Sequence, residues 1–304
     1  MGAVTWDIMK GMTFRSEFGF ENNSEEQRRF WGMETSKARS NNNQPVAEWS
    51  MKQGTKWQLT NVWNYNFMLK EAHDIRLMLG QEIKHNQTTT KTYSTRFFPE
   101  NITAEKVFDN LSLGTPYENS SSAASPSRIS SFFGRINYGY NDKYLATVTL
   151  RADGSSKFAK DNRWGFFPSA AVAWRISSEN FMEGTKNWLD DLKLRVSYGT
   201  AGNNNIPSDQ TRTVWAAGSS PAIGWINGIN NFWTTGAQMT NPDLKWETTY
   251  TRNFGLDFTM FNGKLNGTVE YYWNTTDDLL INFPVSGVGY STQYRNLGKT
   301  ENKG

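Results

Sequence analysis

The stretch that decides the fold runs from residue 130 to residue 176. It reads SSFFGRINYGY (130–140), NDK (141–143), YLATVTLRAD (144–153) and, after a polar loop, WGFFPSAAVAWRI (164–176). Successive side chains of a β-strand point to opposite faces, so residues of one parity share a face. The uncharged parity consists of Phe132, Gly134, Ile136, Tyr138, Tyr140, Tyr144, Ala146, Val148, Leu150 and Ala152, continued by Trp164, Phe166, Ala170, Val172, Trp174 and Ile176. Every charge falls on the other parity. Such alternation, with aromatic residues at the ends, is typical of strands that cross a bilayer around a wet interior.

The 304-residue chain is polar on average but rich in aromatic residues. Hydrophobic residues make up 37% and aromatic residues 14%, including 13 Trp, and the mean hydropathy is −0.67. No run approaches the roughly 18 apolar residues that a membrane helix needs. A membrane barrel explains this composition because only alternate residues meet lipid. A soluble β-rich binding protein has a similar composition, so composition alone leaves both classes open.

The same counts exclude several kinds of chemistry. With no Cys there is neither a disulfide framework nor a Cys-ligated metal site. A net charge of +3 without a Lys/Arg block gives no case for a nucleic-acid partner. The two histidines, His73 in a predicted turn and His85 at a predicted strand end, are interpreted as solvated surface groups without metal-ligand partners. We therefore predict no enzyme activity, no metal site and no cofactor.

Short and long connections alternate along the chain. Short turns are predicted at 9–11, 69–73, 141–143, 177–191 and 261–264, and long loops at 22–56, 86–127, 154–163, 203–245 and 275–293. In an up-and-down meander, alternate connections lie at the same end, so one end carries tight turns and the other long loops, as in outer-membrane barrels. About eleven strands result, the last of them near Tyr294. Ser178 is the expected N-cap of a helical piece in the connection 177–191.

Three polar residues interrupt the apolar parity: Asn61, Gln81 and Arg252. Each is expected toward the long-loop half of its strand. A charge facing lipid costs roughly 2–4 kcal/mol at the bilayer midplane and little at the interface. This placement predicts a membrane band nearer the short turns, with Tyr138, Tyr140, Tyr144, Trp164 and Trp174 in the interfacial aromatic girdles.

Several long motifs carry a family resemblance. The segments RADGSSKFAKDNRWGFFPSAAVAWRIS (151–177), WLDDLKLRVSYGTAGNNNI (188–206), NPDLKWETT (241–249) and FGLDFTMFNGKLNGTVEYYWNTTDDLL (254–280) closely resemble the barrel of SusC/RagA-type TonB-dependent receptors. LGQEIKH (79–85) and FFGRINYGYNDKYL (132–145) fit as well. The likeness covers nearly the whole chain.

The resemblance implies an all-β, antiparallel, up-and-down transmembrane β-barrel in the outer membrane of Bacteroidota, about 22 strands in full with a plugged lumen. Residues 1–304 then correspond to an internal part of the barrel domain, without the plug domain and the closing C-terminal strands. The implied partners are a SusD-type surface lipoprotein, the TonB complex through a missing N-terminal part, the lipid bilayer, and an oligosaccharide or peptide substrate. By itself such a piece is not expected to form a closed pore.

Two sets of candidate site residues follow. Trp215, Trp225, Phe232 and Trp233 lie in the predicted loop 203–245, where aromatic faces could stack on a substrate or fold the loop and meet the lid lipoprotein. The second set is a predicted lumen-facing charged row, which could pair internally and against a plug or line the substrate path. It consists of Arg135, Arg151, Arg175, Lys193, Arg195, Asp257 and Glu270. The alternative function from another class is a soluble, secreted β-rich carbohydrate-binding protein.

Overall fold

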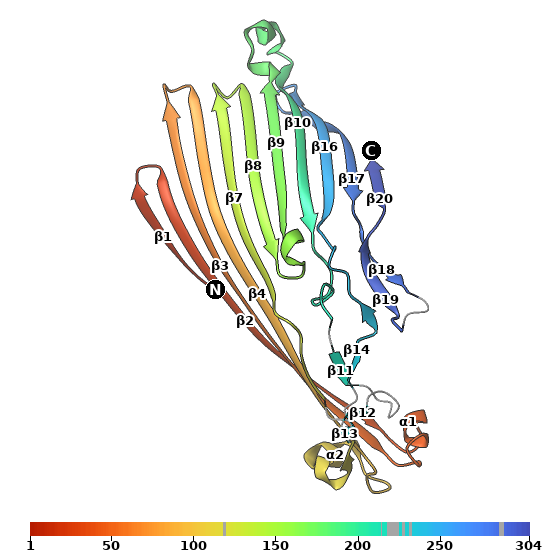
Figure 1. Cartoon of the computed structure of the whole chain (residues 1–304). Coiled ribbons are helices and arrows are strands. Elements are labelled where there is room, and N and C mark those ends of the chain that lie inside the picture. The colour runs from red at the N-terminus through yellow and green to blue at the C-terminus, as the bar shows by residue number, and fades with distance from the viewer. Residues whose placement is uncertain (118–119, 214, 218–224, 227–228, 231–232, 286–288) are drawn as a thin grey trace. The chain divides into compact units, whose positions relative to one another are not determined.

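The structure is a computed structural model of the whole chain (Figure 1). It describes residues 1–117, 120–213, 215–217, 225–226, 229–230, 233–285 and 289–304, and between 214 and 235 it describes the backbone of strands only. Contacts divide the chain into two units: residues 1–18, 58–84 and 128–304 form the first, and residues 19–57 and 85–127 form the second. Among the described residues, no helix is both long and apolar enough to cross a membrane.

One antiparallel sheet dominates the first unit, and its strands follow one another in chain order (Figure 1). The main path comprises β1 (Gly2–Met9), β2 (Met12–Trp31), β3 (Val46–Leu69), β4 (His73–Arg96), β7 (Ser127–Tyr140), β8 (Tyr144–Ser155), β9 (Trp164–Arg175), β10 (Leu189–Asn203), β16 (Glu247–Met260), β17 (Leu265–Asp277) and β20 (Lys299–Lys303). The predicted all-β, up-and-down topology is therefore confirmed. The sheet ends at β1 on one side and at β20 on the other.

The predicted short turns all lie at one end of this sheet. Each short connection forms a backbone hydrogen bond with the neighbouring pair of strands along the sheet. The connections therefore lie in one row. These bonds, each 2.8 Å from N to O, run from Asn66 to Gly11, from Asn141 to Ala72, from Arg175 to Lys143 and from Phe261 to Trp188. At the tightest turns, Asn141, Asp142 and Asn262 have positive φ angles, which Asn and Asp tolerate better than bulkier residues.

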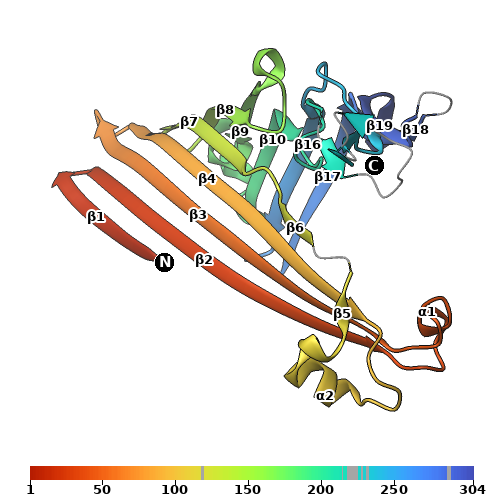
Figure 2. The same cartoon turned by 60° about the horizontal axis from the view of Figure 1, so that its bottom comes forward.

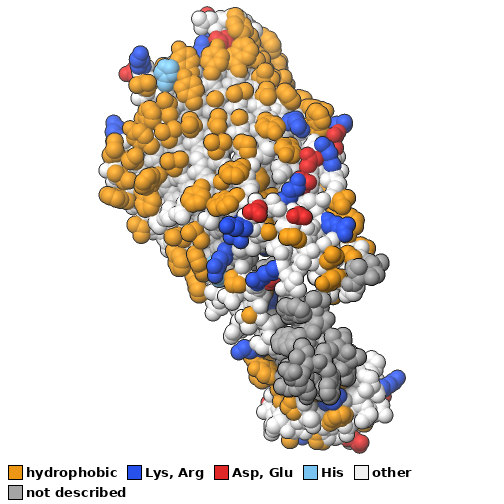
Figure 3. Space-filling view, viewed as in Figure 1, with side chains coloured by type: hydrophobic (Ala, Val, Ile, Leu, Met, Phe, Trp, Pro, Cys, Tyr) orange, Lys and Arg blue, Asp and Glu red, His pale blue; other side chains and the backbone are white. Residues whose placement is uncertain are grey.

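The register joins the two parities of successive strands into two continuous faces. On one face Ile136 pairs with Val148 and Val148 with Ala170. The same face continues on β10 and β16, where Leu194 pairs with Leu256. We call this the apolar face. Its large side chains are exposed: Leu150 is 62% and Phe166 73% accessible. Figure 3 shows hydrophobic side chains spread over the strands.

The expectation of long loops at 22–56 and 86–127 is wrong in its boundaries. β2 continues to Trp31, β3 begins at Val46 and β4 ends at Arg96, so much of both segments is strand. A strand is held by ladder hydrogen bonds and needs an apolar side only where that side is covered. In these extensions polar residues occupy both parities, as in NNSEEQRR (22–29), so the alternation that marks the other strands disappears.

The second unit adds short elements to these extensions. It contains α1 (Ser36–Arg39), α2 (Ala104–Asp109) and the 3₁₀ turn Leu111–Leu113. The short strands β5 (Thr115–Pro116) and β6 (Ser120–Ala123) pair with β4 (Figure 2). Ala47, Phe98 and Val107 form its small buried core, with Phe30, Ile102, Phe108 and Leu111 packed around it.

Two details of the first unit also differ from expectation. Ser178 is no N-cap: it ends the 3₁₀ helix Ile176–Ser178, and a second 3₁₀ helix, Asn180–Thr185, follows Glu179. The last strand of the sheet is β20, whereas Tyr294 belongs to β19 (Thr292–Asn296). β19 forms a separate small sheet with β15 (Gln238–Met239) and β18 (Leu280–Pro284). A short strand inside a loop carries too few residues to show a periodic pattern.

Candidate functional site

All seven residues of the predicted charged row lie on the face opposite the apolar face. Arg135 pairs with Thr149, Arg175 with Lys193, and Lys193 with Asp257, so β7, β8, β9, β10 and β16 contribute to one surface. Glu270 of β17 extends this surface through its partner Gly255. We call it the charged face. The parity of the sequence therefore predicted correctly which residues share a face.

A cluster of ion pairs joins β10, β16 and β17 on this face. Arg195 donates two hydrogen bonds to the Asp257 carboxylate, at 2.8 and 2.9 Å, and one to Glu270 at 2.7 Å. Lys193 lies 3.0 Å from the same Asp257 carboxylate, and the Thr268 hydroxyl donates to it at 3.0 Å. Two cations thus meet two carboxylates, and the cluster neutralises itself. Its side chains are partly accessible, from 23% for Asp257 to 43% for Glu270.

A second cluster on the charged face centres on Arg151. Its guanidinium donates to both oxygens of Asp153 at 2.8–2.9 Å, to the Ser131 hydroxyl at 3.0 Å and to Glu82 at 3.5 Å. It also lies 5.3 Å from the centre of the Phe133 ring, a cation–π distance. Arg151 therefore has several of its hydrogen-bond donors engaged by neighbouring side chains, although the side chain is still 37% accessible.

The remaining arginines of the row are less constrained. Arg175 lies 3.5 Å from Asp191, whose other contact is the Ser177 hydroxyl at 2.7 Å. Arg135 is exposed and donates only to the Thr149 hydroxyl, at 3.2 Å, among the contacts of the described residues. Arg135 is therefore the cation of the row with most capacity left for a ligand.

A shallow hollow of about 360 Å³ lies beside the first cluster. Its floor is made of the small side chains Ala171 and Ala173, and Leu145, Thr147, Lys193 and Arg195 border it. Hydroxyl and cationic donors line its rim, so it can hold water or a polar group by hydrogen bonds. It contains no pair of groups arranged for nucleophilic or acid–base catalysis.

At the long-loop end, loops distant in sequence share one apolar core. Phe158, Phe167, Ile206, Leu244 and Trp246 are all less than 10% accessible, and Leu280 and Tyr294 pack against them. The Trp246 indole nitrogen donates to the Arg163 carbonyl at 3.0 Å. Burial lowers the pKa of Lys157, which donates to the Asn204 carbonyl at 3.4 Å. Sequence reasoning missed this core, although the aromatic residues in FFP and LKW were a signal.

Asn296 ties two of these loops together. Its amide nitrogen donates to the Lys245 and Asp278 carbonyls, each at 2.9 Å, and its oxygen accepts from the Lys245 backbone at 2.9 Å. The Gln293 side chain adds a bond to the Thr240 carbonyl at 2.9 Å. These bonds hold the C-terminal end of the segment that contains the aromatic substrate candidates.

Three of those candidates lie on short strands. Trp215 lies in β11 (Trp215–Ala217), Trp225 in β12 (Trp225–Ile226) and Trp233 in β14 (Trp233–Thr235). Phe232 lies outside the described residues. β11 pairs with β14, and β12 pairs with β13 (Ile229–Asn230). The pairing brings the backbones of Trp215 and Trp233 into one two-stranded sheet.

The predicted girdle residues lie on the apolar face at its two ends. Tyr140 pairs with Tyr144 and Tyr144 with Trp174 at the short-turn end. At the other end the rings of Phe132 and Trp164 are stacked, 6.2 Å between centroids. The two aromatic girdles are ten residues apart along β8, which corresponds to about 33 Å along the strand. A strand tilted by about 40° converts this into a band about 25 Å tall, the height of a barrel's apolar belt.

The polar exceptions on the apolar face have partners. The Asn61 amide nitrogen lies 3.4 Å from the Gln81 oxygen on the neighbouring strand. Arg252 lies with its guanidinium 4.8 Å from the Trp273 ring and 5.9 Å from the Tyr198 ring. Each interruption is thus partly shielded by neighbours on the same face.

Both histidines differ from the solvated groups that we expected. His73 begins β4, is half-buried, and its Nδ1 lies 2.8 Å from the Tyr138 hydroxyl. His85 lies inside β4 and is stacked on Trp57 at 5.5 Å. Their neighbours are aromatic, which the one-dimensional pattern did not reveal. No group of three acidic, Cys or His side chains suited to a metal ion occurs among the residues that the structure describes.

Taken together, these features define a class of protein. A meander with tight turns at one end, long loops at the other, an exposed apolar face between aromatic rings and a charged face behind it is the wall of an outer-membrane barrel. The chain belongs to the family described as "TonB dependent receptor-like, beta-barrel", whose model matches residues 3–304. The family is one of outer-membrane receptors and transporters, so the chain is an outer-membrane protein. This assignment removes the support for a soluble, secreted protein.

Similar proteins support the same family. The chain is 37% identical over 82% of its length to TonB-dependent receptor P26 of Formosa agariphila and 41% identical over 60% to TonB-dependent receptor SusC of Bacteroides thetaiotaomicron. A solved structure of the RagAB peptide transporter matches 99% of the chain with a TM-score of 0.84 and 25% identity. The chain spans only 24% of the P26 receptor, 18% of SusC and 32% of the RagAB chain.

Proposed function

We propose that this chain forms part of the barrel wall of a TonB-dependent importer that takes up oligosaccharides or peptides with a SusD-type surface lipoprotein. One observation carries the proposal: the solved structure of the RagAB peptide transporter matches 99% of this chain with a TM-score of 0.84. Similarity to SusC supports the same transporter class. In this proposal residues 1–304 belong to the β-barrel domain, and energy arrives through the TonB complex.

The two faces then have distinct roles. The apolar face contacts lipid, because its large side chains are exposed between two aromatic rings. The charged face lines the lumen. There the Arg151 and Arg195 clusters bind neighbouring strands to one another, whereas the exposed Arg135 is available to a substrate or to a plug. The hollow beside Lys193 is a second polar feature of this interior.

Membrane sidedness follows from the connections. Short turns face the periplasm and long loops the exterior in outer-membrane barrels. Epitope tags at Asp161, in the connection between β8 and β9, and at Asp142, in the turn between β7 and β8, test this. Intact cells should be labelled at Asp161 and not at Asp142. Labelling with the opposite pattern would invert the topology and contradict the proposal.

Substrate contact is assigned to the aromatic residues of loop 203–245. Trp215→Ala, Trp225→Ala, Phe232→Ala and Trp233→Ala should each weaken uptake about 3- to 10-fold, the value of a lost aromatic contact. Trp164→Ala on the apolar face is the matched control and should leave uptake unchanged.

The assay is uptake of labelled oligosaccharides and labelled peptides by cells whose only receptor of this kind carries the change. Uptake must also stop when TonB is deleted. Uptake that persists without TonB, or loss with Trp164→Ala but not with the loop variants, would contradict the proposal.

A further inference from the structure

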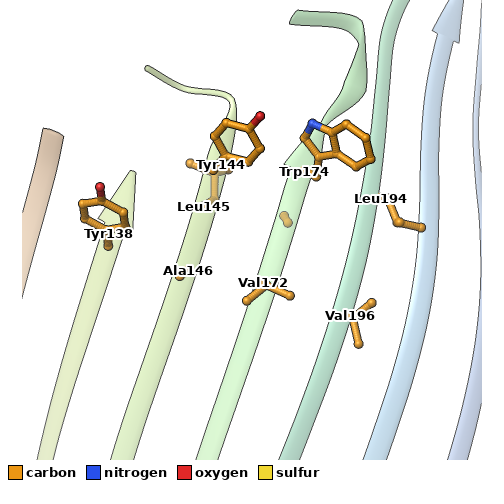
Figure 4. A pocket seen from close by; sticks show the side chains of 9 residues that line it. Tyr138, Tyr144, Leu145, Ala146, Val172, Trp174, Leu194 and Val196 are labelled. Atoms are coloured by element: carbon orange, nitrogen blue, oxygen red, sulfur yellow. The ribbon is translucent and has the colours of Figure 1, made fainter. Parts of the chain in front are cut away.

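A second hollow, of about 290 Å³, lies on the apolar face near the short turns (Figure 4). Small and branched side chains of three neighbouring strands form its floor, with Ala146 from β8, Val172 from β9 and Val196 from β10. Leu194 closes one side. The surface is almost wholly apolar, which suits a hydrocarbon chain better than a sugar.

An aromatic rim limits this hollow toward the turn. Tyr138, Tyr144 and Trp174 stand in a row, and Figure 4 shows the Tyr138 and Tyr144 hydroxyls and the Trp174 ring nitrogen on the side away from the Val172 and Val196 side chains. Tyrosine and tryptophan in this arrangement have an apolar body and a polar tip, which suits the boundary between hydrocarbon and headgroups. The polar tips of this rim therefore point away from the floor of the hollow.

An acid–base pair lies just beyond the rim. Glu179 accepts hydrogen bonds from the Tyr144 hydroxyl at 2.6 Å and from the Trp174 indole at 3.1 Å, and Lys143 lies 3.4 Å away. These donors, the Tyr144 hydroxyl first, hold the pKa of Glu179 below its usual range. Both side chains remain partly accessible, 25% for Lys143 and 15% for Glu179. The rim thus presents one fixed positive and one fixed negative charge side by side.

We propose that the hollow holds one acyl chain of a phospholipid whose zwitterionic headgroup, a phosphate bearing an ammonium, rests on Lys143 and Glu179. The Lys143 ammonium has three N–H donors and uses one on Glu179, so two remain for a phosphate. The Glu179 carboxylate has about four acceptor positions and uses three, so one remains for an ammonium. An anionic headgroup without an ammonium would meet the Glu179 charge without compensation. This inference rests on the lipid-facing role of the apolar face in the proposed function.

Native mass spectrometry of the receptor, purified from outer membranes in mild detergent, tests the site. The delipidated receptor is offered phosphatidylethanolamine or phosphatidylglycerol with identical acyl chains. One phosphatidylethanolamine molecule should be retained, with an affinity about tenfold higher than for phosphatidylglycerol, the effect of one charge-assisted hydrogen bond. Equal retention of both lipids, retention of detergent alone, or a second copy of the receptor in place of lipid would overturn the proposal.

Two pairs of variants sharpen the result. Ala146→Trp fills the floor and should abolish retention, whereas Val148→Trp, two residues along the same face and outside the hollow, should not. Glu179→Gln keeps an acceptor for Tyr144 and Trp174 but removes the charge, so the lipid should stay while the preference disappears. Equal effects of the two Trp variants, or an unchanged preference in Glu179→Gln, would count against the site. Because the assay needs neither substrate nor TonB, failed import leaves its outcome unaffected.

Discussion

Val148→Arg should severely impair assembly of the barrel in the membrane. Val148 lies on the apolar face, 45% exposed and paired with Ile136 and Ala170. Along β8 it is four residues, about 13 Å, from the aromatic girdle at Tyr144. It is six residues, about 20 Å, from the girdle at Phe132 and Trp164. This position is near the bilayer midplane. An arginine there costs roughly 2–4 kcal/mol, or about 30- to 700-fold in the equilibrium between assembled and unassembled protein.

The neighbouring substitution Thr147→Arg is the matched control. Thr147 points to the charged face, where its hydroxyl donates to Asn137 at 2.9 Å and borders the polar hollow. Losing that bond costs about 1 kcal/mol, a several-fold effect. The assay compares the amounts of receptor in the outer membrane and their heat-modifiable mobility on gels. Equal assembly of the two variants would refute the assignment of the faces, whatever its absolute level.

Three further perturbations test other parts of the structure. Asp257→Ala leaves Lys193 and Arg195 with Glu270 as the one carboxylate of the cluster, and it should lower stability by about 1–2 kcal/mol in denaturant unfolding, more than Asp257→Asn. Gly202→Ala places a Cβ against the Phe167 ring and should cost about 1–3 kcal/mol, whereas Gly184→Ala, where a Cβ meets nothing, should be neutral. The lowered pKa of Glu179 stabilises the folded connection above the ordinary Glu pKa, so its hydrogen-exchange protection should fall as the pH drops below about 4.5, and Glu179→Gln should remove that dependence.

The apolar face was predictable from sequence because a membrane strand displays its environment in every second residue. Ile136, Val148 and Leu256 lie exposed on the apolar face, so the pattern needed no knowledge of their neighbours. The hairpin at Asn262-Gly263 was equally local, since its backbone requires residues that tolerate positive φ. Local chemistry sufficed in both cases.

The strand extensions were not predictable in this way. In residues 22–31 of β2 polar side chains occupy both parities, so the only signal of a strand is the hydrogen-bond ladder to its neighbours. The apolar core at the long-loop end was not predicted for a related reason. Phe158 and Leu244 look like isolated apolar residues in polar loops, and only the fold brings them together.

The candidate site was half predictable. Parity placed Lys193, Arg195 and Asp257 on one face, but their pairing depends on the register between β10 and β16. The long segment 203–245 joins those strands, and the ladder shifts register near Leu189, so no count along the chain gives the pairing. Only the structure therefore shows which cations are paired with carboxylates. It distinguishes the paired Arg195 from the exposed Arg135.

The shared core at the long-loop end has a consequence for the order in which the protein acquires its structure. Phe158 and Phe167 find their partners in Leu244 and Trp246, and Tyr294 packs on last in chain order. Contacts across so many residues form slowly, because the intervening chain must first be ordered. This core can therefore be complete only once the segments that carry Leu244, Trp246 and Tyr294 are in place. We therefore expect the core to form late, and a chain without Leu244 and Trp246 should leave Phe158 and Phe167 exposed to added protease.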